Sequence, residues 1–197
     1  DTMFGSLVYW AERIIAGISL FADHYGRVYV PVVVGNHGRL TRKPRTKARA
    51  RDNVDWLLGH MIRRHFRYDS RVTVDVPDAA DLRFDVHSTR VLLTHGDQTG
   101  GGGGIGGIWP PLKRLVAQKR AQYANDPFDL VLMGHWHQLT WGGEFVVNGS
   151  IKGFDEYALV SRFPPERPQQ ALMLITPEHG LTVQMPVIVA HKQKEGW

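Results

Sequence analysis

The sequence predicts an α/β fold in which two mixed β-sheets pack together and helices flank them. Helix-like and strand-like segments alternate in the first half of the chain, and strand-like segments dominate the second half. The composition agrees with this class, because 43% apolar and 22% charged residues are ordinary for a globular protein. A chain of 197 residues is long enough for one well-buried core, so we predict a single domain over residues 1–197.

The individual elements follow from apolar spacing and from the glycines and prolines that bound each segment. Residues 2–24 have helical spacing, with Asp1 as a plausible N-cap and Gly26 just beyond the last turn. The β-branched run 28–34 predicts a buried strand of a parallel sheet, in which Pro31 indicates an edge or a bulge. We also predict helices at 53–66 and 111–123, strands at 72–76 and 130–133, and hairpins within 82–93, 139–147 and 171–187.

Several classes of protein are excluded or disfavoured by what the sequence lacks. There are no cysteines, which excludes disulfides and zinc–thiolate sites, so any metal must be held by oxygen and nitrogen ligands. The most apolar stretch, residues 6–21, is interrupted by Glu12 and Arg13 and is short for a bilayer span, so we expect no membrane contact. A cytoplasmic location fits these features, and the oligomeric state stays open. The chain opens inside a helix-like pattern without a methionine, which favours an N-terminally truncated fragment.

Three predicted strands end in the same way, with a glycine next to a histidine. The strand 28–34 leads into Gly35-Asn36-His37, residues 90–93 lead into 94–97 (Thr-His-Gly-Asp), and residues 130–133 lead into 134–137 (Gly-His-Trp-His). In α/β sheets, ligands bind at the carboxyl ends of strands, where the loops diverge. One histidine at a strand end is ordinarily structural, but three such ends in one chain favour a common metal site.

In this order, the three motifs resemble the third, fourth and fifth sequence blocks of calcineurin-like metallophosphoesterases. Residues 148–150 (Asn-Gly-Ser) are similar to a stretch that often follows the last block, and the residues around the blocks resemble phosphoesterases of phages and prophages in particular. The resemblance covers the chain from about residue 20 to its end. It implies the metallo-dependent phosphatase-like sandwich of two mixed β-sheets flanked by helices.

The resemblance also implies a role for each motif residue. Asn36, His95 and His135 match ligands of one metal ion, and His137 matches a ligand of another. His37 matches the histidine that lies over the substrate phosphate and assists the leaving group. Two divalent cations are implied, among which manganese, iron, zinc and nickel are not distinguished by nitrogen and oxygen ligands. Such a dinuclear site hydrolyses phosphate esters with a metal-bound hydroxide.

The sequence departs from the family pattern at two places. The two earlier blocks, an Asp-x-His and a Gly-Asp that complete the metal site, do not precede Gly35. Asp1 is either the bridging carboxylate, since it lies 35 residues before Asn36, or only a helix cap. Without those blocks, we expect poor activity from the chain alone. The second departure is Gly38, where many relatives carry an acid, so the group that orients His37 stays open.

Positive charge is concentrated directly after the proposed catalytic histidine. Seven lysines and arginines lie within residues 39–51 with no acid among them until Asp52, although the whole chain carries a net charge of only +5. Arg39 and Arg42 are the predicted contacts to a substrate phosphate, because a guanidinium fork suits phosphate oxygens. Residues 43–51 are either a solvated loop or contacts to a longer polyanion such as nucleic acid. The glycine-rich segment 99–107 lacks the lysine of a P-loop and is interpreted as a flexible rim.

The sequence therefore predicts metal-dependent phosphoester hydrolysis, and the basic run favours a phosphodiester or nucleic-acid substrate. One alternative is a phosphomonoesterase or cyclic-nucleotide phosphodiesterase that acts on small molecules. Another, from a different class, is a nucleic-acid-binding module with a degenerate metal site.

Overall fold

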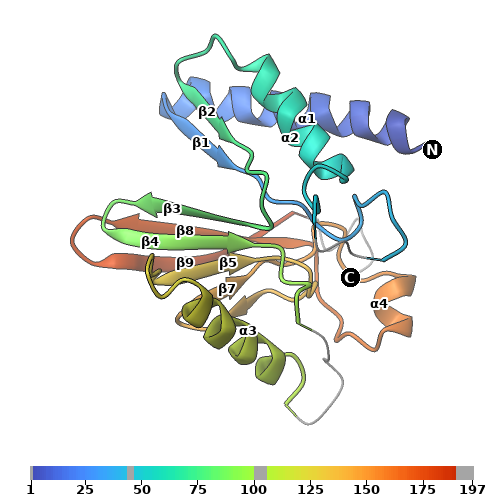
Figure 1. Ribbon diagram of the computed structural model, residues 1–197, viewed down its shortest axis with the longest axis vertical. Coiled ribbons are helices and arrows are strands. Elements are labelled where there is room, and N and C mark those ends of the chain that lie inside the picture. Colours follow the sequence, from blue (N-terminus) through green and yellow to red (C-terminus); the bar gives the residue numbers. More distant parts are fainter. Residues whose placement is uncertain (1, 44–46, 100–105, 190–197) are drawn as a thin grey trace. The chain divides into compact units, whose positions relative to one another are not determined.

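A computed structural model describes residues 2–43, 47–99 and 106–189 of the chain. The described residues contain four α-helices and nine β-strands, in an order that alternates early and is rich in strands late (Figure 1). The chain separates into two compact units, Asp1–Leu82 and Arg83–Trp197, which are described one at a time. The α/β class is confirmed, and the single domain stays a prediction.

The first unit contains two helices and a pair of parallel strands. These are α1 (Met3–Tyr25), β1 (Val28–Pro31), α2 (Val54–His65) and β2 (Val72–Asp75), with Val28 opposite Val72 in the β-ladder. The parallel pairing was predicted for the first strand. That strand ends three residues earlier than predicted, at Pro31, which lies at the edge of a two-stranded sheet. The core of the first unit is formed by both helices and both strands. Its buried residues are Ile18, Ala22, Ile62, Phe66, Val72, Val74 and Val76.

Helix α1 differs from its prediction at the N-terminus. Thr2 is the N-cap, and its hydroxyl accepts a hydrogen bond from the Gly5 amide at 3.2 Å. Asp1, the predicted cap and alternative bridging ligand, lies outside the described residues. Gly26 ends the helix in a left-handed conformation (φ 76°), as predicted.

Helix α1 bears on the prediction that the chain makes no membrane contact. The helix has 23 residues and, by length and apolar composition, could cross a membrane. The prediction of no membrane contact was based on the shorter apolar stretch 6–21. Core helices of soluble proteins and signal sequences meet the same criteria. Length therefore does not decide the question, and the absence of membrane contact stays a prediction.

The second unit is built on a mixed five-stranded sheet in the order β3-β4-β5-β7-β6. Its elements are β3 (Asp81–Val86, whose first residues precede the unit boundary), β4 (Thr89–Thr94), α3 (Trp109–Gln122), β5 (Leu130–Met133), β6 (Thr140–Trp141), β7 (Phe145–Val147), α4 (Glu156–Val160), β8 (Gln169–Thr176) and β9 (Gly180–Ile188). β5 pairs in parallel with both β4 and β7, and β6 closes the edge as the antiparallel partner of β7. β8 and β9 form a separate antiparallel hairpin.

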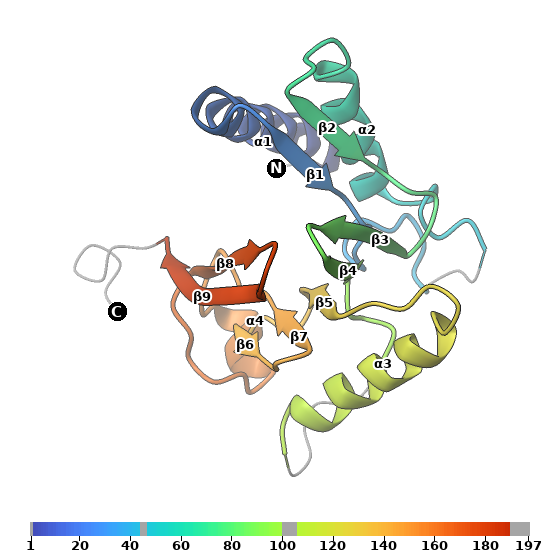
Figure 2. The same cartoon turned by 90° about the vertical axis from the view of Figure 1, so that its left-hand side faces the viewer.

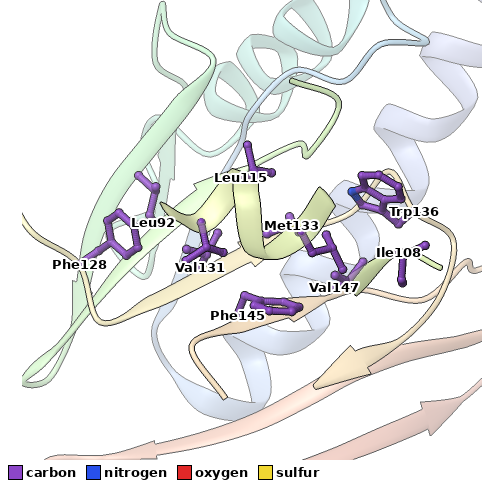
Figure 3. Packing of buried hydrophobic residues seen from close by; sticks show 11 residues of the cluster. Leu92, Ile108, Leu115, Phe128, Val131, Met133, Trp136, Phe145 and Val147 are labelled. Carbon is purple, nitrogen blue, oxygen red and sulfur yellow. The ribbon is translucent and has the colours of Figure 1, made fainter. Parts of the chain in front are cut away.

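Helix α3 and the β8–β9 hairpin cover opposite faces of this sheet (Figure 2). On the α3 face, Leu112, Leu115 and Val116 pack against Leu92, Val131, Met133, Phe145 and Val147 (Figure 3). On the other face, Leu93, Leu132 and Val146 line a cavity of about 250 Å³ together with Ala171 and Met173 of β8. Alternate residues of each strand therefore face the helix and the hairpin, as the two-residue period of a strand requires.

Candidate metal centre

The loop that carries Asn36 and His37 is fastened to the first turn of α2. The side-chain amide of Asn53, the N-cap of α2, donates to the Gly35 carbonyl oxygen at 2.7 Å. The Asp55 carboxylate accepts from the Gly35 amide nitrogen at 2.8 Å, and the Val54 amide donates to the Gly38 carbonyl at 2.6 Å. Asn53 is only 3% exposed, so its hydrogen bonds to the loop are shielded from water.

The role of Asn53 and Asp55 in holding this loop was not predicted from the sequence. Asn53 directly precedes an apolar helical pattern and Asp55 lies in the first turn, which is the ordinary signal of a helix N-terminus. That signal predicted where α2 begins, but it did not reveal that the cap also holds the loop 35–38. In this arrangement His37 is exposed and Asn36 is half-buried.

Arg39 and Arg42 lie in the same unit as His37. Arg39 is half-buried and its backbone forms an isolated antiparallel bridge with Asn53, whereas Arg42 is exposed. At the end of the basic run, Arg51 forms an ion pair with Asp78. Residues 44–46 of the run, with Arg45 among them, lie outside the described residues.

In the second unit, the ends of β4 and β5 bring two of the predicted ligands together. The Gly134 amide donates to the His95 carbonyl at 3.2 Å, which joins the two strand ends. The imidazole rings of His95 and His135 have centroids 5.1 Å apart and are inclined by 65°. The parallel pairing of β4 and β5 places the two histidines side by side, although they are 40 positions apart in the sequence.

This separation fits two imidazoles that share one cation. A nitrogen ligand lies about 2.1 Å from a zinc-like ion, so each ring centroid would lie about 3.2 Å from it. At a tetrahedral angle the two centroids would then be about 5.2 Å apart, and at a right angle about 4.5 Å. The observed 5.1 Å is within this range. Among the described residues, however, no three His, Asp or Glu side chains gather as a metal-binding group.

The Gly134–His137 turn has an unusual backbone. His135 and His137 both have positive φ angles, 66° and 55°, which are uncommon for residues other than glycine. Such conformations cost on the order of 1–3 kcal/mol each, and they cluster at functional sites. Trp136 between them is 8% exposed and belongs to the hydrophobic core of α3 and the sheet (Figure 3). The buried tryptophan anchors the turn in the core, whereas the ring of His135 lies next to His95 and the ring of His137 lies in a different environment.

His137 lies in an aromatic environment supplied by the segment after β7. Its ring centroid is 5.7 Å from Tyr157 of α4 and 5.7 Å from Phe163, and these two rings contact each other. Helix α4 was not predicted, because its five residues are too few for a helical pattern to stand out. The aromatic neighbours of His137 were therefore not predicted either.

Asn148 has a structural role at the same end of the sheet. Its backbone nitrogen donates to the Met133 carbonyl at 2.7 Å, and its side-chain oxygen accepts from the backbone amides of Gly149 and Ala171. The side-chain nitrogen donates to Gln170 at 2.8 Å. Asn148 thus joins β5, β7 and β8 near the histidine turn.

Comparisons with known proteins give only distant likenesses. No protein-family model and no curated sequence matches the chain. Among solved structures, Vps29 of Entamoeba histolytica complexed with zinc is 15% identical, with a TM-score of 0.39 and coverage of 86% of this chain and 88% of that one. For a single-mutant form of the same Vps29, this chain spans only 61% of the other's length.

Two further solved structures are similar at the same level. Vps29 of Cryptosporidium parvum is 13% identical, with a TM-score of 0.38 over 81% of this chain and 96% of that one. A predicted phosphoesterase of Streptococcus pneumoniae TIGR4 is 14% identical, with a TM-score of 0.31 over 81% and 95%. Likenesses at this level do not carry an argument about the site, which rests on the residues of this chain.

Proposed function

We propose that this protein hydrolyses phosphate esters with the aid of divalent metal ions. The observation that carries the proposal is the His95–His135 pair, whose ring centroids lie 5.1 Å apart at the ends of two adjacent parallel strands. Two supporting features are the left-handed backbone at His135 and His137 and the partly buried hydrogen bonds that hold the loop of His37. The motifs favour the calcineurin-like family, and the residues around them favour its phage and prophage type.

The proposal assigns roles that follow the motif. Asn36, His95, His135 and His137 would hold two metal ions, which when bound supply positive charge at a phosphoryl oxygen and an activated water. His37, exposed on a loop that Asn53 and Asp55 hold in place, would give a proton to the departing oxygen. Arg39 and Arg42, which follow on the same loop, would bind the substrate phosphate oxygens.

We propose a phosphodiester in nucleic acid as the substrate, because the basic run begins two residues after His37. Many phosphate contacts make binding fall steeply with salt, whereas a small phosphate ester makes few. A shallow dependence of the Michaelis constant on potassium chloride concentration would therefore favour a small-molecule phosphatase or a cyclic-nucleotide phosphodiesterase.

A second candidate is a nucleic-acid-binding module with a degenerate metal site. It is favoured by the lack of a three-residue metal-binding group among the described residues. This candidate predicts nucleic-acid binding that is unaffected by chelators and an absence of hydrolysis with any divalent metal.

The decisive experiment compares His95→Ala and His135→Ala with His37→Ala in the full-length gene product. Loss of either paired imidazole should weaken metal binding by more than about 100-fold. Mutation of a residue that only hydrogen-bonds to a metal ligand already lowers metal affinity about 10–100-fold. Manganese titration by calorimetry and hydrolysis of bis-p-nitrophenyl phosphate are the two measurements. The His37→Ala variant should keep its metal and lose turnover by about 100-fold.

His179→Ala is the matched control, because His179 is an exposed histidine outside the motifs, and it should behave as the wild type. Full activity of His95→Ala or His135→Ala in a folded protein would refute the metal site. Loss of metal from His37→Ala would refute the role given to His37.

A further inference from the structure

The last turns of α2 and the turn that follows carry a cluster of basic residues. His60, Arg63 and Arg64 lie on one face of the helix, Arg67 lies just beyond its C-cap Phe66, and together the four line an open pocket of about 330 Å³. We call these four residues the α2 arginine face. A neighbouring pocket of about 400 Å³ shares Arg63 and Arg67 and also includes Tyr68.

Among the described residues, the three arginines of this face have no acidic partner. Within the described part of the chain, Arg63, Arg64 and Arg67 form no ion pair with a carboxylate. Several other arginines are paired with carboxylates, for example Arg71 with Asp69 and Asp23, and Arg90 with Asp129. Basic side chains also interact favourably with the end of a helix dipole, but that effect falls off within one turn and does not require a pocket.

The base of the face is held in place by packing and hydrogen bonds. The rings of Trp56 and His60 have centroids 3.8 Å apart, and the Trp56 indole nitrogen donates to Asp78 at 3.0 Å. A guanidinium nitrogen of Arg63 donates to Nδ1 of His60 at 2.9 Å, so the arginine is oriented before any ligand arrives. Burial, and then the charge of Arg63, lowers the pKa of His60, so this imidazole stays neutral and accepts the bond.

An exposed aromatic residue adjoins the basic cluster. Tyr68 is 87% exposed, and the guanidinium of Arg67 lies over its ring at 4.5 Å from the centroid. Basic side chains beside an exposed aromatic ring are typical of surfaces that bind single strands, where phosphates meet the charges and bases stack on the rings. A site for one small phosphate would instead need enclosed donors, whereas these arginines are exposed.

We propose that the α2 arginine face, with Tyr68, binds a single-stranded segment of nucleic acid through its backbone phosphates. The choice of ligand rests on the proposed function, since it names the substrate class for the same protein. Helix α2 holds the His37 loop at its first turn and carries Arg63 and Arg64 at its last, about 16 Å away along the axis at 1.5 Å per residue. Phosphates bound at the arginine face would therefore lie several nucleotides from the one at His37.

The test measures binding without metal. A fluorescein-labelled single-stranded DNA of 20 nucleotides is titrated with protein in EDTA, and its anisotropy is followed between 50 and 250 mM KCl. For the triple variant Arg63→Gln, Arg64→Gln, Arg67→Gln, we expect Kd at 50 mM salt to rise at least tenfold. The slope of log Kd against log salt should fall by about 2, since each phosphate contact on a single strand contributes about 0.7.

The matched control removes three exposed arginines from other places, Arg13→Gln, Arg27→Gln and Arg114→Gln. It keeps the net charge equal to that of the test variant and should lower the slope by less than about 0.5. Tyr68→Ala should raise Kd about 5- to 100-fold with the slope unchanged, because stacking on a ring is not salt-dependent.

Three results would overturn the proposal: no binding by the wild type, equal losses in the test and control triples, or displacement of the DNA by micromolar inorganic pyrophosphate. The last result would mean that the face binds a small polyphosphate. Failure of hydrolysis would count against the proposed function and not against this binding face. The binding assay contains EDTA and no metal, so His95→Ala should bind the DNA as the wild type does.

Discussion

At the scale of single residues, the space around Gly38 leaves no room for a side chain. A Cβ atom at this position would lie 2.2 Å from Oδ1 of Asn53 and 2.5 Å from Oδ1 of Asp55, distances that real side chains do not adopt. The same two side chains hold Gly35 from the other side. A larger side chain at position 38 would not fit, and the first turn of α2 holds the loop of His37.

Gly38→Ala should therefore destabilise the protein by about 1–3 kcal/mol, because the added methyl group displaces the Asn53 and Asp55 side chains. Urea unfolding measures this loss, and hydrolysis by the folded fraction should fall as well. Gly17→Ala is the control, since nothing lies within 4 Å of its added Cβ. In the middle of α1 it should stabilise by about 0.5–1 kcal/mol. A Gly38→Ala protein as stable and active as the wild type would contradict this account of the loop.

At the scale of elements, β4 and β5 are joined at both ends. At the histidine end, the Gly134 amide bonds to His95. At the other end, the backbone nitrogen and Nε of Arg90 donate to Asp129 at 2.9 and 3.0 Å, and Nη2 donates at 2.7 Å. The Asp129 amide donates back to the Arg90 carbonyl at 2.8 Å. These bonds fix the register on which the His95–His135 pair depends.

The Arg90–Asp129 interaction predicts an acid dependence of stability. Hydrogen bonds from the Arg90 side chain and, to a smaller extent, from its backbone amide lower the pKa of Asp129 from 3.8 to about 2. A depressed carboxylate pKa stabilises the fold above the unfolded value, so this contribution is complete above about pH 4 and is lost as the pH falls towards 2. Both side chains are more than 40% exposed, so the contribution should stay below about 1 kcal/mol.

Asp129→Asn should remove this part of the slope when the free energy of unfolding is measured in urea between pH 2 and 6. Glu178→Gln changes an exposed carboxylate in the hairpin turn and should leave the slope unchanged. Identical slopes for the wild type and Asp129→Asn would show that the Arg90 interaction does not contribute.

At the scale of the whole molecule, each unit has its own hydrophobic core. In the second unit, Phe145 is fully buried and contacts Trp109 at 5.7 Å between ring centroids, at the centre of the layer between α3 and the sheet (Figure 3). The added Cβ of an alanine at Gly142 would lie 2.3 Å from the same ring. The hairpin β6–β7 can therefore close only around a glycine, and its closure places Val147 and Asn148 at the histidine end.

Phe145→Ala should cost about 3–5 kcal/mol, since it removes a fully buried ring from a packed core. Phe4→Ala removes a ring that is 66% exposed and should change stability by less than about 0.5 kcal/mol. Thermal and urea unfolding followed by circular dichroism compare the two. A loss below 1 kcal/mol for Phe145→Ala would mean that this layer can collapse around the missing ring.

The sequence by itself determined most of the elements, because their signals are local. Apolar runs and bounding glycines predicted β5 with its bounds, Leu130–Met133, as well as the hairpins β6–β7 and β8–β9. The five-residue helix α4 was missed, and Thr2 stands as the N-cap of α1 where Asp1 was expected. Short elements and exact ends depend on a few hydrogen bonds that no periodicity reveals.

Strand order and the partners of the histidines were decided only by the tertiary structure. Nothing near β5 in the sequence indicates that it pairs with β7 on one side and β4 on the other, and this pairing brings His135 beside His95. The motif predicted which histidines bind metal, but not that Tyr157 and Phe163 surround His137 or that Asn53 and Asp55 hold the loop of His37. A residue type and its neighbours along the chain favour a local conformation, whereas contacts between distant segments exist only once the chain has folded.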